Sequence, residues 1–436
     1  MTMGTHTVLI VGSGGREFAL AERFGADSSV AQVLLVPGNP AMQRLSKCVC
    51  LQGEVVELAR HHDVDLVIVG PEKPLVNGLA DELRAIGIPV VGPSKSAAIL
   101  EESKIASKQF MQTVGIPTAR CTWHDGVESA LQGLDDWSAI DGVVIKSDAL
   151  AGGKGVVLCD SVSEAKKVVH SFMEDLTVTV KTDRILFEEK LYGVELSAFA
   201  LCDGLTWRWL GVACDHKRVG DNDTGPNTGG MGTFIPEDFL TEHQRSEIER
   251  IFDLVVQGMA DRGTPYQGIL FAGLMINPSG VRPDSDEQVS VVEFNIRLGD
   301  PETQVLLPTL EGSIFDVFQA AALGTLDQCK ADLQQSKYAV HVVAAAKGYP
   351  SIDGTPIPKG DAISIGKLPD NTSVVCAGVS LSAESLVTSG GRVLGVTGLG
   401  TTLAEARTLA YEAIAQVQFE GMHHRTDIAS AQRMRF

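Results

Sequence analysis

Three side chains spaced two residues apart, Glu293, Asn295 and Arg297, form the most distinctive chemical pattern in the sequence. The residues around them in 291–296 are valine, phenylalanine and isoleucine, which favour a β-strand. Alternate side chains of a strand point to the same side, so we expect the three on one face. A carboxylate, an amide oxygen and a guanidinium together suit a divalent cation with an anion beside it. The alternative is a solvated edge strand with an ordinary salt bridge.

Two further carboxylates, Asp300 and Glu302, follow in the sequence Gly-Asp-Pro-Glu at 299–302, which predicts a turn. Each of them could orient Arg297 or contact a substrate, and the sequence does not separate these two roles. The whole stretch 291–304, VVEFNIRLGDPETQ, is therefore the candidate around which the other elements must be placed.

The stretch 215–232, DHKRVGDNDTGPNTGGMG, is a long polar run with five glycines. Long polar loops inside compact enzymes are usually functional or disordered. The basic cluster at 216–218, His-Lys-Arg, stands out in an acidic protein and indicates an anionic ligand. A disordered surface loop is the alternative interpretation.

A second glycine-rich stretch, GGKG at 152–155, follows a predicted strand at 142–146. The order of strand, glycine loop and strand differs from a P-loop, and the pattern G-x-x-x-x-G-K-[ST] occurs nowhere in the sequence. A glycine-rich hairpin still brings backbone N–H groups close to phosphates, and Lys146 and Lys154 add positive charge. We therefore favour phosphate binding over an ordinary flexible hairpin.

Acidic residues also flank a predicted turn between the strand at 185–191, ILFEEKL, and the strand that begins at 194. Backbone at such a hinge can pair with an adenine edge, and a carboxylate can bind ribose hydroxyls. Charged edge strands have the same composition, so this pattern alone does not separate the two interpretations.

The N-terminus has the pattern of a doubly wound parallel sheet. A buried strand at 7–11, TVLIV, leads into Gly-Ser-Gly-Gly-Arg-Glu at 12–17 and then into a helical segment at 18–24. Further strands are predicted at 33–36, 65–69 and 89–91, with helical segments between them. Such a domain gathers its ligand-binding loops at the carboxyl ends of its strands.

The N-terminal glycine loop does not fit a nicotinamide site. Glu17 stands where the fingerprint has its last glycine, and the second strand ends in Val-Pro at 36–37 rather than in an acid. A sugar phosphate suits the loop better, because the N–H groups at 14–15 and the guanidinium of Arg16 suit phosphate. Glu72 suits ribose hydroxyls, and glycines that only permit tight turns are the alternative.

The length and composition limit the class of protein. At 436 residues the chain is too long for one compact domain, and about three domains are expected. A formal net charge of −19 excludes a general attraction to nucleic acid or anionic membranes. No apolar run is long enough to span a bilayer, and no signal-peptide pattern begins the sequence. Eight scattered cysteines without C-x-x-C indicate neither a zinc site nor a disulfide framework, so we expect a cytoplasmic protein.

The remaining predicted elements connect these motifs. We expect a helix at 94–111 that contains Lys104, and a pair of strands at 268–276 and 289–297 that carries the Glu-x-Asn-x-Arg pattern. A last unit begins near Tyr338 and is interpreted as a separate small α/β domain.

Taken together, these motifs resemble the phosphoribosylamine–glycine ligase family, also called glycinamide ribonucleotide synthetases, within the ATP-grasp superfamily. The motif in 215–232 is highly specific for this family, whereas the glycine loops are not. The matching segments run in family order along nearly the whole chain: Gly14-Gly15-Arg16-Glu17, Val69-Gly70-Pro71-Glu72, Lys154-Gly155-Val156, the segments 215–221 and 223–232, Glu293-Phe294-Asn295 with Arg297, and the segment 299–304.

The resemblance implies an activity. ATP would phosphorylate the carboxylate of glycine, and the amine of 5-phosphoribosylamine would attack the acyl phosphate. The products would be glycinamide ribonucleotide, ADP and phosphate, a step of de novo purine synthesis. No enzyme nucleophile is needed, so catalysis would consist of positioning and charge neutralisation. The alternative is another ATP-grasp carboxylate–amine ligase with a different substrate pair; a nucleotide sensor or a nicotinamide oxidoreductase fits the residues less well.

The resemblance also implies roles for individual residues. The ATP phosphates would be held by Lys104, Lys146, Gly152, Gly153, Lys154 and Gly155, and adenosine by Glu189, Leu191 and Glu195. Glu293 and Asn295 would carry Mg²⁺ or Mn²⁺, with ATP oxygens and water completing the shell because Phe271 stands near the position of a second carboxylate. Arg297 and Asp215 would orient glycine and, with Lys146, form the catalytic set. Substrate contacts would further come from Gly14, Gly15, Arg16, Glu17, Glu72, Asp300 and Glu302.

The implied fold is a multidomain α/β and α+β protein. A doubly wound parallel α/β domain at 1–102 would precede an ATP-grasp fold at 103–332, with a lid at about 117–193, and a small C-terminal α/β cap at 333–436. The expected partners are ATP, glycine and 5-phosphoribosylamine, with no nucleic acid and no membrane, in a monomer or weak homo-oligomer. Phe18 departs from the family pattern by replacing a usual histidine. The other departures are Ser147, Ala149 and Gly153 in the glycine loop, and Ile296 and Leu298 beside the Glu-x-Asn-x-Arg pattern.

Overall fold

The N-terminal domain is a five-stranded parallel sheet in the computed structural model, which describes residues 5–137, 142–150, 155–174, 181–237, 240–277, 288–351 and 354–430. Its strand order is β3-β2-β1-β4-β5, with bounds β1 His6–Gly12, β2 Val30–Pro37, β3 Cys48–Cys50, β4 Leu66–Val69 and β5 Val90–Val91. The connecting helices are α1 Gly15–Ala26, α2 Val55–His61, α3 Glu72–Asn77 and α4 Leu79–Ala85. The predicted doubly wound parallel domain is confirmed, with β3 as an additional edge strand.

The N-terminal domain is packed onto the middle of the chain. Its central strand β1 is buried because residues 8–11 are all aliphatic. Helix α1 packs against α10 (Thr303–Thr309), which directly follows the 291–304 stretch. Phe24 of α1 meets Phe318 of α11 (Ile314–Leu323) edge to face, with 5.6 Å between the ring centroids. The first glycine loop is thereby fixed beside the predicted catalytic strand.

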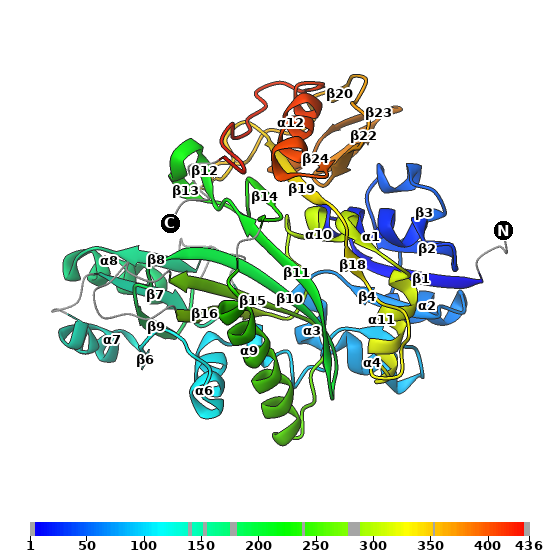
Figure 1. Cartoon of the computed structure of the whole chain (residues 1–436). Helices are drawn as coiled ribbons and strands as arrows, with labels where there is room; N and C mark the ends of the chain where they lie inside the picture. Colours follow the sequence, from blue (N-terminus) through cyan, green and yellow to red (C-terminus); the bar gives the residue numbers. More distant parts are fainter. Residues whose placement is uncertain are drawn as a thin grey trace.

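A single eight-stranded sheet runs through the central and C-terminal parts of the molecule (Figure 1). Its order is β16-β15-β10-β11-β14-β19-β24-β21, and its paired strands are antiparallel. The bounds are β10 Val194–Asp203, β11 Trp207–Asp215, β14 Gly232–Phe234, β15 Gln267–Asn277, β16 Gln288–Asn295, β19 Tyr338–Ala345, β21 Thr372–Cys376 and β24 Arg392–Gly400. Helix α9 (Glu242–Asp261) packs against β10, β11 and β16.

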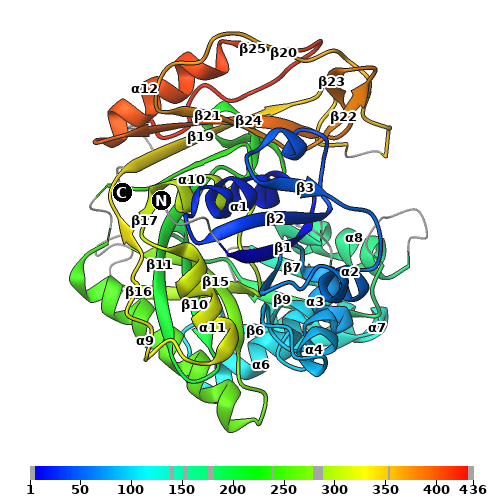
Figure 2. The same ribbon diagram turned by 90° about the vertical axis from the view of Figure 1, so that its right-hand side faces the viewer.

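Strand β14 joins the C-terminal domain to the central sheet. Its Thr233 pairs with Asp215 of β11 on one edge and with His341 of β19 on the other. Gly232 permits this close approach, because a Cβ there would lie 2.7 Å from the carbonyl oxygen of His341. The interpretation of a separate unit from Tyr338 onward did not anticipate this continuity. Figure 2 shows the C-terminal strands as a layer across the N-terminal sheet, with α12 (Leu403–Ile414) on the outer side.

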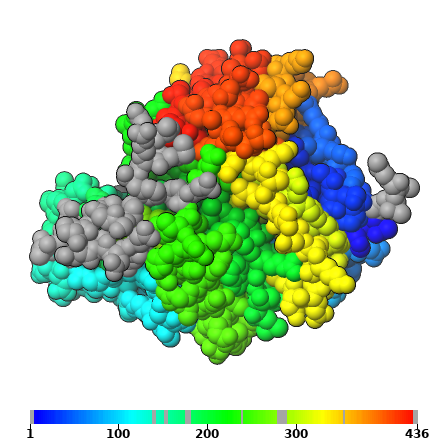
Figure 3. Space-filling model, in the orientation of Figure 1, coloured from blue at the N-terminus to red at the C-terminus, as the bar shows by residue number. Residues whose placement is uncertain are grey.

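A second, smaller antiparallel sheet forms a lid with its own hydrophobic core. The lid order is β6-β9-β7-β8, with bounds β6 Cys121–Asp125, β7 Val143–Ser147, β8 Val156–Cys159 and β9 Arg184–Glu189, and its helices are α7 Val127–Gly133 and α8 Val162–Met173. Its core residues, which include Trp137, Ile145 and Phe187, form a cluster separate from the main core. Figure 3 shows the lid projecting from one side of the molecule. Since the main core spans all three other parts, the lid is the part that can move on its own.

The single helix predicted for 94–111 is wrong, because the chain breaks at Ser103. Its two helical parts are α5 Ile99–Glu102 and α6 Lys104–Val114. The hydroxyl of Ser103 donates to Oδ1 of Asp148 at 2.9 Å, and the N–H of Ile105 donates to the same oxygen at 3.1 Å. A carboxylate from the lid thus binds the N-terminus of α6, a partner that local sequence cannot reveal. The break places Lys104 at the first position of α6.

The remaining elements are short. They are η1 Met42–Arg44, η2 Leu134–Trp137, β12 Arg218–Gly220, η3 Asp221–Asp223, β13 Thr224–Asn227, β17 Leu310–Glu311, β18 Gln334–Gln335, β20 Ser364–Ile365, β22 Val379–Ser382, β23 Ser385–Thr388 and β25 Val417–Gln418. The polar run 215–232 therefore forms a β-hairpin, β12–β13, followed by β14. Within the described ranges, no helix combines the length and the apolar character required to cross a lipid bilayer.

Replacing Phe187 by alanine should loosen the lid without unfolding the rest of the protein. Phe187 is fully buried and contacts Trp137 and His124 inside the lid core. The resulting cavity should cost about 3–5 kcal/mol of lid stability. Amide hydrogen exchange measures this: β7 and β9 should lose protection while β1 and β10 keep it. An equal loss of protection in all four strands would show that lid and body unfold as one unit.

Candidate active site

A cavity of about 440 Å³ opens where the four parts of the molecule meet. The N-terminal domain contributes Arg16, the lid Lys146, the central sheet Glu293 and the C-terminal domain Arg392. Most of the lining side chains are charged, which suits a charged polar ligand rather than an apolar one. The predicted site residues that line the cavity are Arg16, Glu72, Lys104, Lys146, Gly155, Glu195, Asp215, Glu293, Asn295, Arg297, Asp300 and Glu302.

Strand β16 directs Glu293 and Asn295 into this cavity, and Arg297 follows directly after the strand. A β-bulge precedes them: Glu293 pairs with Gly273, whereas Val291 pairs with Leu274. The alternation of side chains holds from Glu293 onward, so the three polar groups share the cavity face as their spacing indicated. Oδ1 of Asn295 accepts a hydrogen bond from Nη2 of Arg297 at 3.4 Å.

Two carboxylates hold the guanidinium of Arg297. Its Nε lies 3.3 Å from Oε2 of Glu72, and its Nη2 lies 3.2 Å from Oε1 of Glu101. The other oxygen of Glu101 accepts the N–H of Ile296 at 2.8 Å, so Glu101 fixes both the side chain and its backbone. Burial lowers the pKa of Arg297, but Glu101 and Glu72 outweigh it and raise that pKa above its ordinary value. Burial raises the pKa of Glu101, and Arg297 opposes the rise.

Glu293 lies in a field of positive charge. Burial raises the pKa of its carboxyl group, yet the surrounding cations outweigh burial and lower that pKa below its ordinary value. Glu293 is therefore ionised at neutral pH. The cations responsible are Lys104, Lys146, Lys217 and Arg297. A carboxylate shared by this many cations leaves net positive charge for an anionic ligand such as a phosphate chain.

A buried ion cluster joins α6 to the lid. Oε1 of Glu188, on β9, lies 2.9 Å from Nζ of Lys146 on β7. Its other oxygen, Oε2, lies 3.2 Å from Nζ of Lys108 on α6. All three side chains are nearly inaccessible to water. Burial lowers the pKa of Lys108, and the Glu188 carboxylate opposes this. Lys146 also donates to the carbonyl oxygen of Val292 at 3.3 Å, which ties the lid to β16.

A second wall of the cavity carries alternating charges. Nζ of Lys217 lies 2.9 Å from Oε2 of Glu195, at the start of β10. Burial raises the pKa of Asp215 to about 7; Lys217 opposes the rise, and Glu302 and Glu195 add to it. Oε1 of Glu302 accepts from the hydroxyl of Ser197 at 3.1 Å. This wall offers carboxylates to a ligand ammonium group, and its Asp215 changes protonation near pH 7.

The N-terminal loop presents Arg16 to the cavity and keeps Glu17 beneath it. Glu17 is 2% exposed, and its two oxygens accept the N–H of Gly14 at 2.6 Å and Nε of Arg16 at 2.5 Å. Glu17 thus supports the loop from within and is not among the residues that line the cavity. Gly70 leaves room for it, because a Cβ there would lie 1.9 Å from Oε1 of Glu17. Gly15 lies against Gln304, so the loop is seated on the end of the 291–304 stretch.

Asp300 links the central and C-terminal domains. Its Oδ2 lies 3.3 Å from Nη2 of Arg392, and Nη1 of Arg392 donates to the carbonyl oxygens of Asp300 and Gly229 at 2.7 and 2.6 Å. Burial raises the pKa of Asp300, but Arg392 and Arg16 outweigh it and lower that pKa. Asp300 thus orients Arg392, a partner that its sequence position did not indicate.

Several predicted residues do not line the cavity in this structure. Gly14 and Gly15 lie behind Arg16, and neither Glu189 nor Leu191 is among the lining residues. Oε1 of Glu189 instead accepts the N–H of Arg120 at 2.8 Å, at the edge of the lid sheet. The predicted phosphate-loop residues Gly152, Gly153 and Lys154 lie outside the described residues.

Sequence reasoning missed Glu101, Lys108 and Glu188, which all line the cavity. Glu101 and Lys108 look like ordinary charged positions of a helix, and their partners are distant in sequence. Only Glu188 had a usable signal. Glu188 lies two residues after the buried Leu186 on the same strand, so both side chains point to the same face. This alternation indicated that the carboxylate of Glu188 points inward.

The donor set fits a divalent cation bound together with a phosphate ligand. Among the described residues, no group of three or more histidine, cysteine or acidic side chains could hold a metal alone. Glu293 and Asn295 nevertheless offer one anionic and one neutral oxygen, and the field around Glu293 is cationic. Mg²⁺ is commonly bound through one or two carboxylates plus substrate phosphates, which matches this set.

Three family models match the chain in order. The N domain of phosphoribosylglycinamide synthetase matches residues 6–101, its ATP-grasp (A) domain matches residues 102–303, and its C domain matches residues 339–431. Together the three matched ranges span the N-terminal sheet, the lid with the catalytic strand, and the C-terminal domain.

Full-length relatives agree with the family models. Proteins named phosphoribosylamine–glycine ligase from Caldanaerobacter subterraneus subsp. tengcongensis and Rhizobium meliloti are 39% and 41% identical over 429 residues, covering 97% of this chain and 99% and 97% of theirs. The crystal structure of a phosphoribosylamine–glycine ligase from Thermotoga maritima has a TM-score of 0.83 at 34% identity, covering 97% of this chain and 100% of that one. A biotin carboxylase domain from Hydrogenobacter thermophilus, in complex with MgADP, has a TM-score of 0.68 at 16% identity over 96% of this chain and 91% of its own, a likeness of fold alone.

Replacing Glu188 by glutamine should destabilise the protein strongly. The buried ammonium groups of Lys108 and Lys146 would lose their shared counter-charge, and breaking a buried pair typically costs about 3–5 kcal/mol. Urea unfolding followed by circular dichroism measures the loss. The matched control is Glu247→Gln, which breaks the exposed pair with Arg250 and should cost about 0–1 kcal/mol. Equal midpoints for the two variants would contradict the buried cluster.

Proposed function

The chain belongs to the phosphoribosylglycinamide synthetase family, and on that premise we propose how its cavity joins glycine to 5-phosphoribosylamine. The reaction is an ATP-dependent carbon–nitrogen ligation that forms glycinamide ribonucleotide, ADP and phosphate in purine biosynthesis. One observation carries the proposal: Glu293, Asn295 and Arg297 line a single charged cavity. Arg16 lines the same cavity, whose walls come from all four parts of the molecule.

The chemistry has two steps that balance without an enzyme nucleophile. A carboxylate oxygen of glycine attacks the terminal phosphorus of ATP, the bond to the β-phosphate oxygen breaks, and ADP leaves. The amine of phosphoribosylamine then attacks the acyl carbon, phosphate leaves, and the amine gives up a proton. Both steps depend on positioning and on neutralising charge at phosphoryl oxygens.

The phosphate chain of ATP binds on the cationic side of the cavity. Lys104 at the start of α6 and Lys146 on β7 both act on Glu293, and Gly155 directly precedes β8, the return strand of the lid hairpin. In this proposal Gly152, Gly153 and Lys154 complete the phosphate grip, because backbone N–H groups and an ammonium suit phosphate oxygens. Lid closure would bring these residues over the ligand and exclude water.

Glu293 and Asn295 hold Mg²⁺, or Mn²⁺, in this proposal, supported by the oxygen donors described above. When bound, the ion neutralises charge on the phosphate oxygens. The ionised state of Glu293 at neutral pH makes it ready to ligate without losing a proton. Phe271 and Phe294 also line this region, so nucleotide oxygens and water supply the remaining ligands.

Glycine binds between Arg297 and Asp215. The guanidinium of Arg297 suits the carboxylate that is phosphorylated, and its carboxylate partners Glu72 and Glu101 keep it oriented. Asp215 receives the ammonium group of glycine. Lys146 lies on the phosphate side and stabilises charge during transfer, which completes the proposed catalytic set of Arg297, Asp215 and Lys146.

The ribose phosphate of phosphoribosylamine binds at the N-terminal loops. Arg16 reaches the cavity, and the N–H group of Gly15 lies at the start of α1, where phosphate is favoured. The N–H group of Gly14 donates to Glu17 and would have to exchange that partner for the phosphate. Glu72 can bind ribose hydroxyls. Asp300 and Glu302 close this side of the cavity and contact or orient the substrate, with Glu17 supporting the loop from below.

Adenosine binds at the hinge between β9 and β10. Glu195 lines the cavity and is paired with Lys217 when no ligand is present, so ribose hydroxyls could replace that pairing. Glu189 and Leu191 would supply the adenine-facing backbone after the lid moves. The domain limits proposed for the chain, 1–102, 103–332 and 333–436, assign this hinge to the ATP-grasp domain. Within the described part of the chain the cysteines form no disulfide, which supports the proposed cytoplasmic setting, and a monomer or weak homo-oligomer remains our proposal for assembly.

ADP release with defined substrates tests this function. The purified chain should release ADP only when glycine and 5-phosphoribosylamine are both supplied with Mg·ATP. The Glu293→Gln variant should lose about 100-fold or more in kcat, since electrostatic stabilisation at the phosphoryl group is removed. The exposed Glu242→Gln variant is the control and should keep full activity. Activity with another acid or amine alone would favour a different ATP-grasp carboxylate–amine ligase.

The pH profile should identify Asp215. Its pKa of about 7 means that the carboxylate is present above pH 7 and is protonated as the pH falls below it. Since the ammonium of glycine needs the carboxylate, kcat/KM for glycine should fall as the pH drops through about 7. Asp215→Asn should have a low, flat profile in this range, whereas the exposed Asp370→Asn should keep the wild-type shape. A wild-type profile in Asp215→Asn would contradict the assignment.

A further inference from the structure

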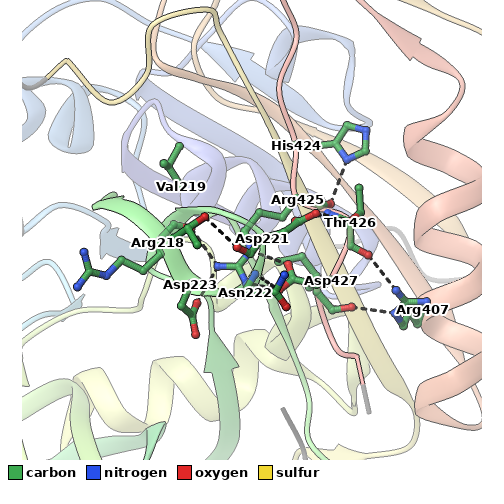
Figure 4. Close-up of polar contacts among 12 residues, drawn as sticks. Arg218, Val219, Asp221, Asn222, Asp223, Arg407, His424, Arg425, Thr426 and Asp427 are labelled. Carbon is green, nitrogen blue, oxygen red and sulfur yellow. Dashed lines mark hydrogen bonds and ion pairs between the residues drawn. The ribbon is translucent and has the colours of Figure 1, made fainter. Parts of the chain in front are cut away.

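The C-terminal domain sends a short segment, residues 423–428 with the sequence HHRTDI, against the hairpin β12–β13 (Figure 4). We call this segment the strap. The hairpin forms a two-stranded sheet of its own, paired only at Arg218 with Asn227 and at Gly220 with Thr224. Two paired positions do not stabilise a hairpin by themselves, so its conformation depends on outside contacts.

Arg425 is the centre of the contact. Its guanidinium is 0% exposed, although it carries a charge. Nε and Nη2 bind the two oxygens of Asp427 at 2.7 and 2.6 Å, and Nη1 donates to the carbonyl oxygen of Arg218 at 3.0 Å and to Oδ1 of Asp223 at 2.9 Å. One side chain therefore joins the strap to β12 and to the turn that follows it. A planar guanidinium fits this fork, and a lysine does not.

Neighbouring groups reinforce the contact at the hairpin tip. Thr426 donates from its N–H and its hydroxyl to the two oxygens of Asp221, at 2.8 and 2.5 Å. Asp427 accepts the N–H of Asn222 at 2.9 Å. Asn222 and Asp223 both have left-handed backbone, with φ of 54° and 55°, a conformation that costs energy unless contacts compensate for it.

The strap is itself fixed to the rigid part of the C-terminal domain. Arg407 of α12 donates to the carbonyl oxygens of Ile428 and Thr426, both at 3.0 Å. The hydroxyl of Tyr411 donates to the carbonyl oxygen of Arg425 at 3.1 Å and accepts the N–H of Ile428 at 3.0 Å. At its other end, the strap backbone pairs with β19 through Ala345. The hairpin is thus held by the core of the C-terminal domain.

The foot of the same hairpin forms part of the cavity wall. Lys217, Asn227, Thr228 and Gly229 all line the cavity. Lys217 directly precedes Arg218, whose carbonyl oxygen is bound by Arg425, and the N–H of Thr228 donates to the carbonyl oxygen of Lys217 at 2.7 Å. The position of the cavity wall therefore follows the position of the hairpin that Arg425 holds.

We propose that Arg425 is a positioning residue for the ligation, acting through the β12–β13 hairpin to hold Lys217 and Asn227 in the cavity wall. The proposal rests on the proposed function. It gives the C-terminal domain a defined role: the active site is incomplete until the strap has docked on the hairpin. Arg425 is called a positioning residue because it is not among the residues that line the cavity.

Three variants separate positioning from general stability. Arg425→Met removes the guanidinium, and Asp223→Asn, at an exposed position of the hairpin, weakens the contact between Arg425 and the turn. Asp223→Asn provides the test if Arg425→Met does not fold. The matched control is Arg208→Met, because Arg208 also donates to several backbone carbonyls, those of Leu326, Cys329 and Ala331, and these lie away from the cavity.

The first measurement is steady-state kinetics, with Arg425→Met and Arg208→Met each assayed at the same number of degrees below its own Tm. Arg425→Met should lower kcat/KM for ligation by about tenfold or more, because small displacements of cavity groups cost that much. The KM for glycine should rise more than the KM for ATP, since Asp215 lies beside the hairpin whereas Lys104 and Lys146 lie on α6 and the lid. Arg208→Met should keep kcat/KM within about twofold. The same kinetic loss in both variants would overturn the proposal, and so would a rise in the KM for ATP as large as the rise for glycine.

The second measurement is limited proteolysis, which needs no activity. Trypsin cleaves after Lys217 and Arg218 only when the hairpin opens, so both Arg425→Met and Asp223→Asn should be cut there about tenfold faster than wild type, as identified by mass spectrometry. Wild-type cleavage rates in both variants would overturn the proposal. Faster cleavage with unchanged kcat/KM would overturn the positioning role alone. A wild-type chain that lacks ligation activity would instead overturn the proposed function.

Discussion

The guanidinium of Arg297 is compensated by two carboxylates from different parts of the chain, and the geometry of the whole cavity depends on this. Glu72 begins a helix of the N-terminal domain, and Glu101 lies in the short helix that leads toward the lid. A largely buried charge without partners would be costly, so these segments must meet around the end of β16. Their meeting places the loop that carries Arg16 beside the strand that carries Glu293 and Asn295.

Charge is distributed in the cavity so that each ligand finds an opposite sign. Lysines surround Glu293 on the side of the lid, where a phosphate chain would lie. Carboxylates surround Lys217 and Asp215 on the opposite wall, where an ammonium group would lie. The lid has a core of its own and is tied to the body by one buried ion cluster. A lid built in this way can close over the nucleotide while the walls that hold the other substrates stay fixed.

Much of the fold and part of the site could be predicted from the sequence, since strand alternation and glycine loops are local signals. Spacing alone placed Glu293, Asn295 and Arg297 together, because a strand that lines a cavity has only two faces. Glu101 and Lys108 could not be found in this way, since what distinguishes them is a partner far away in the sequence. The break at Ser103 and the sheet continuity through β14 could not be predicted for the same reason, because each depends on a partner that is distant in the sequence. The burial of Glu17 could not be predicted, because it depends on the room that Gly70 of another segment leaves for its carboxylate.

The central claim is that this cavity activates the carboxylate of glycine by phosphorylation before the amine attacks. The most direct measurement uses glycine labelled with ¹⁸O in both carboxylate oxygens, together with ATP and 5-phosphoribosylamine, and follows the phosphate product by mass spectrometry. The account predicts that one labelled oxygen is transferred to each phosphate released, because the acyl phosphate keeps the glycine oxygen when its carbon is attacked. Phosphate without the label would contradict the account.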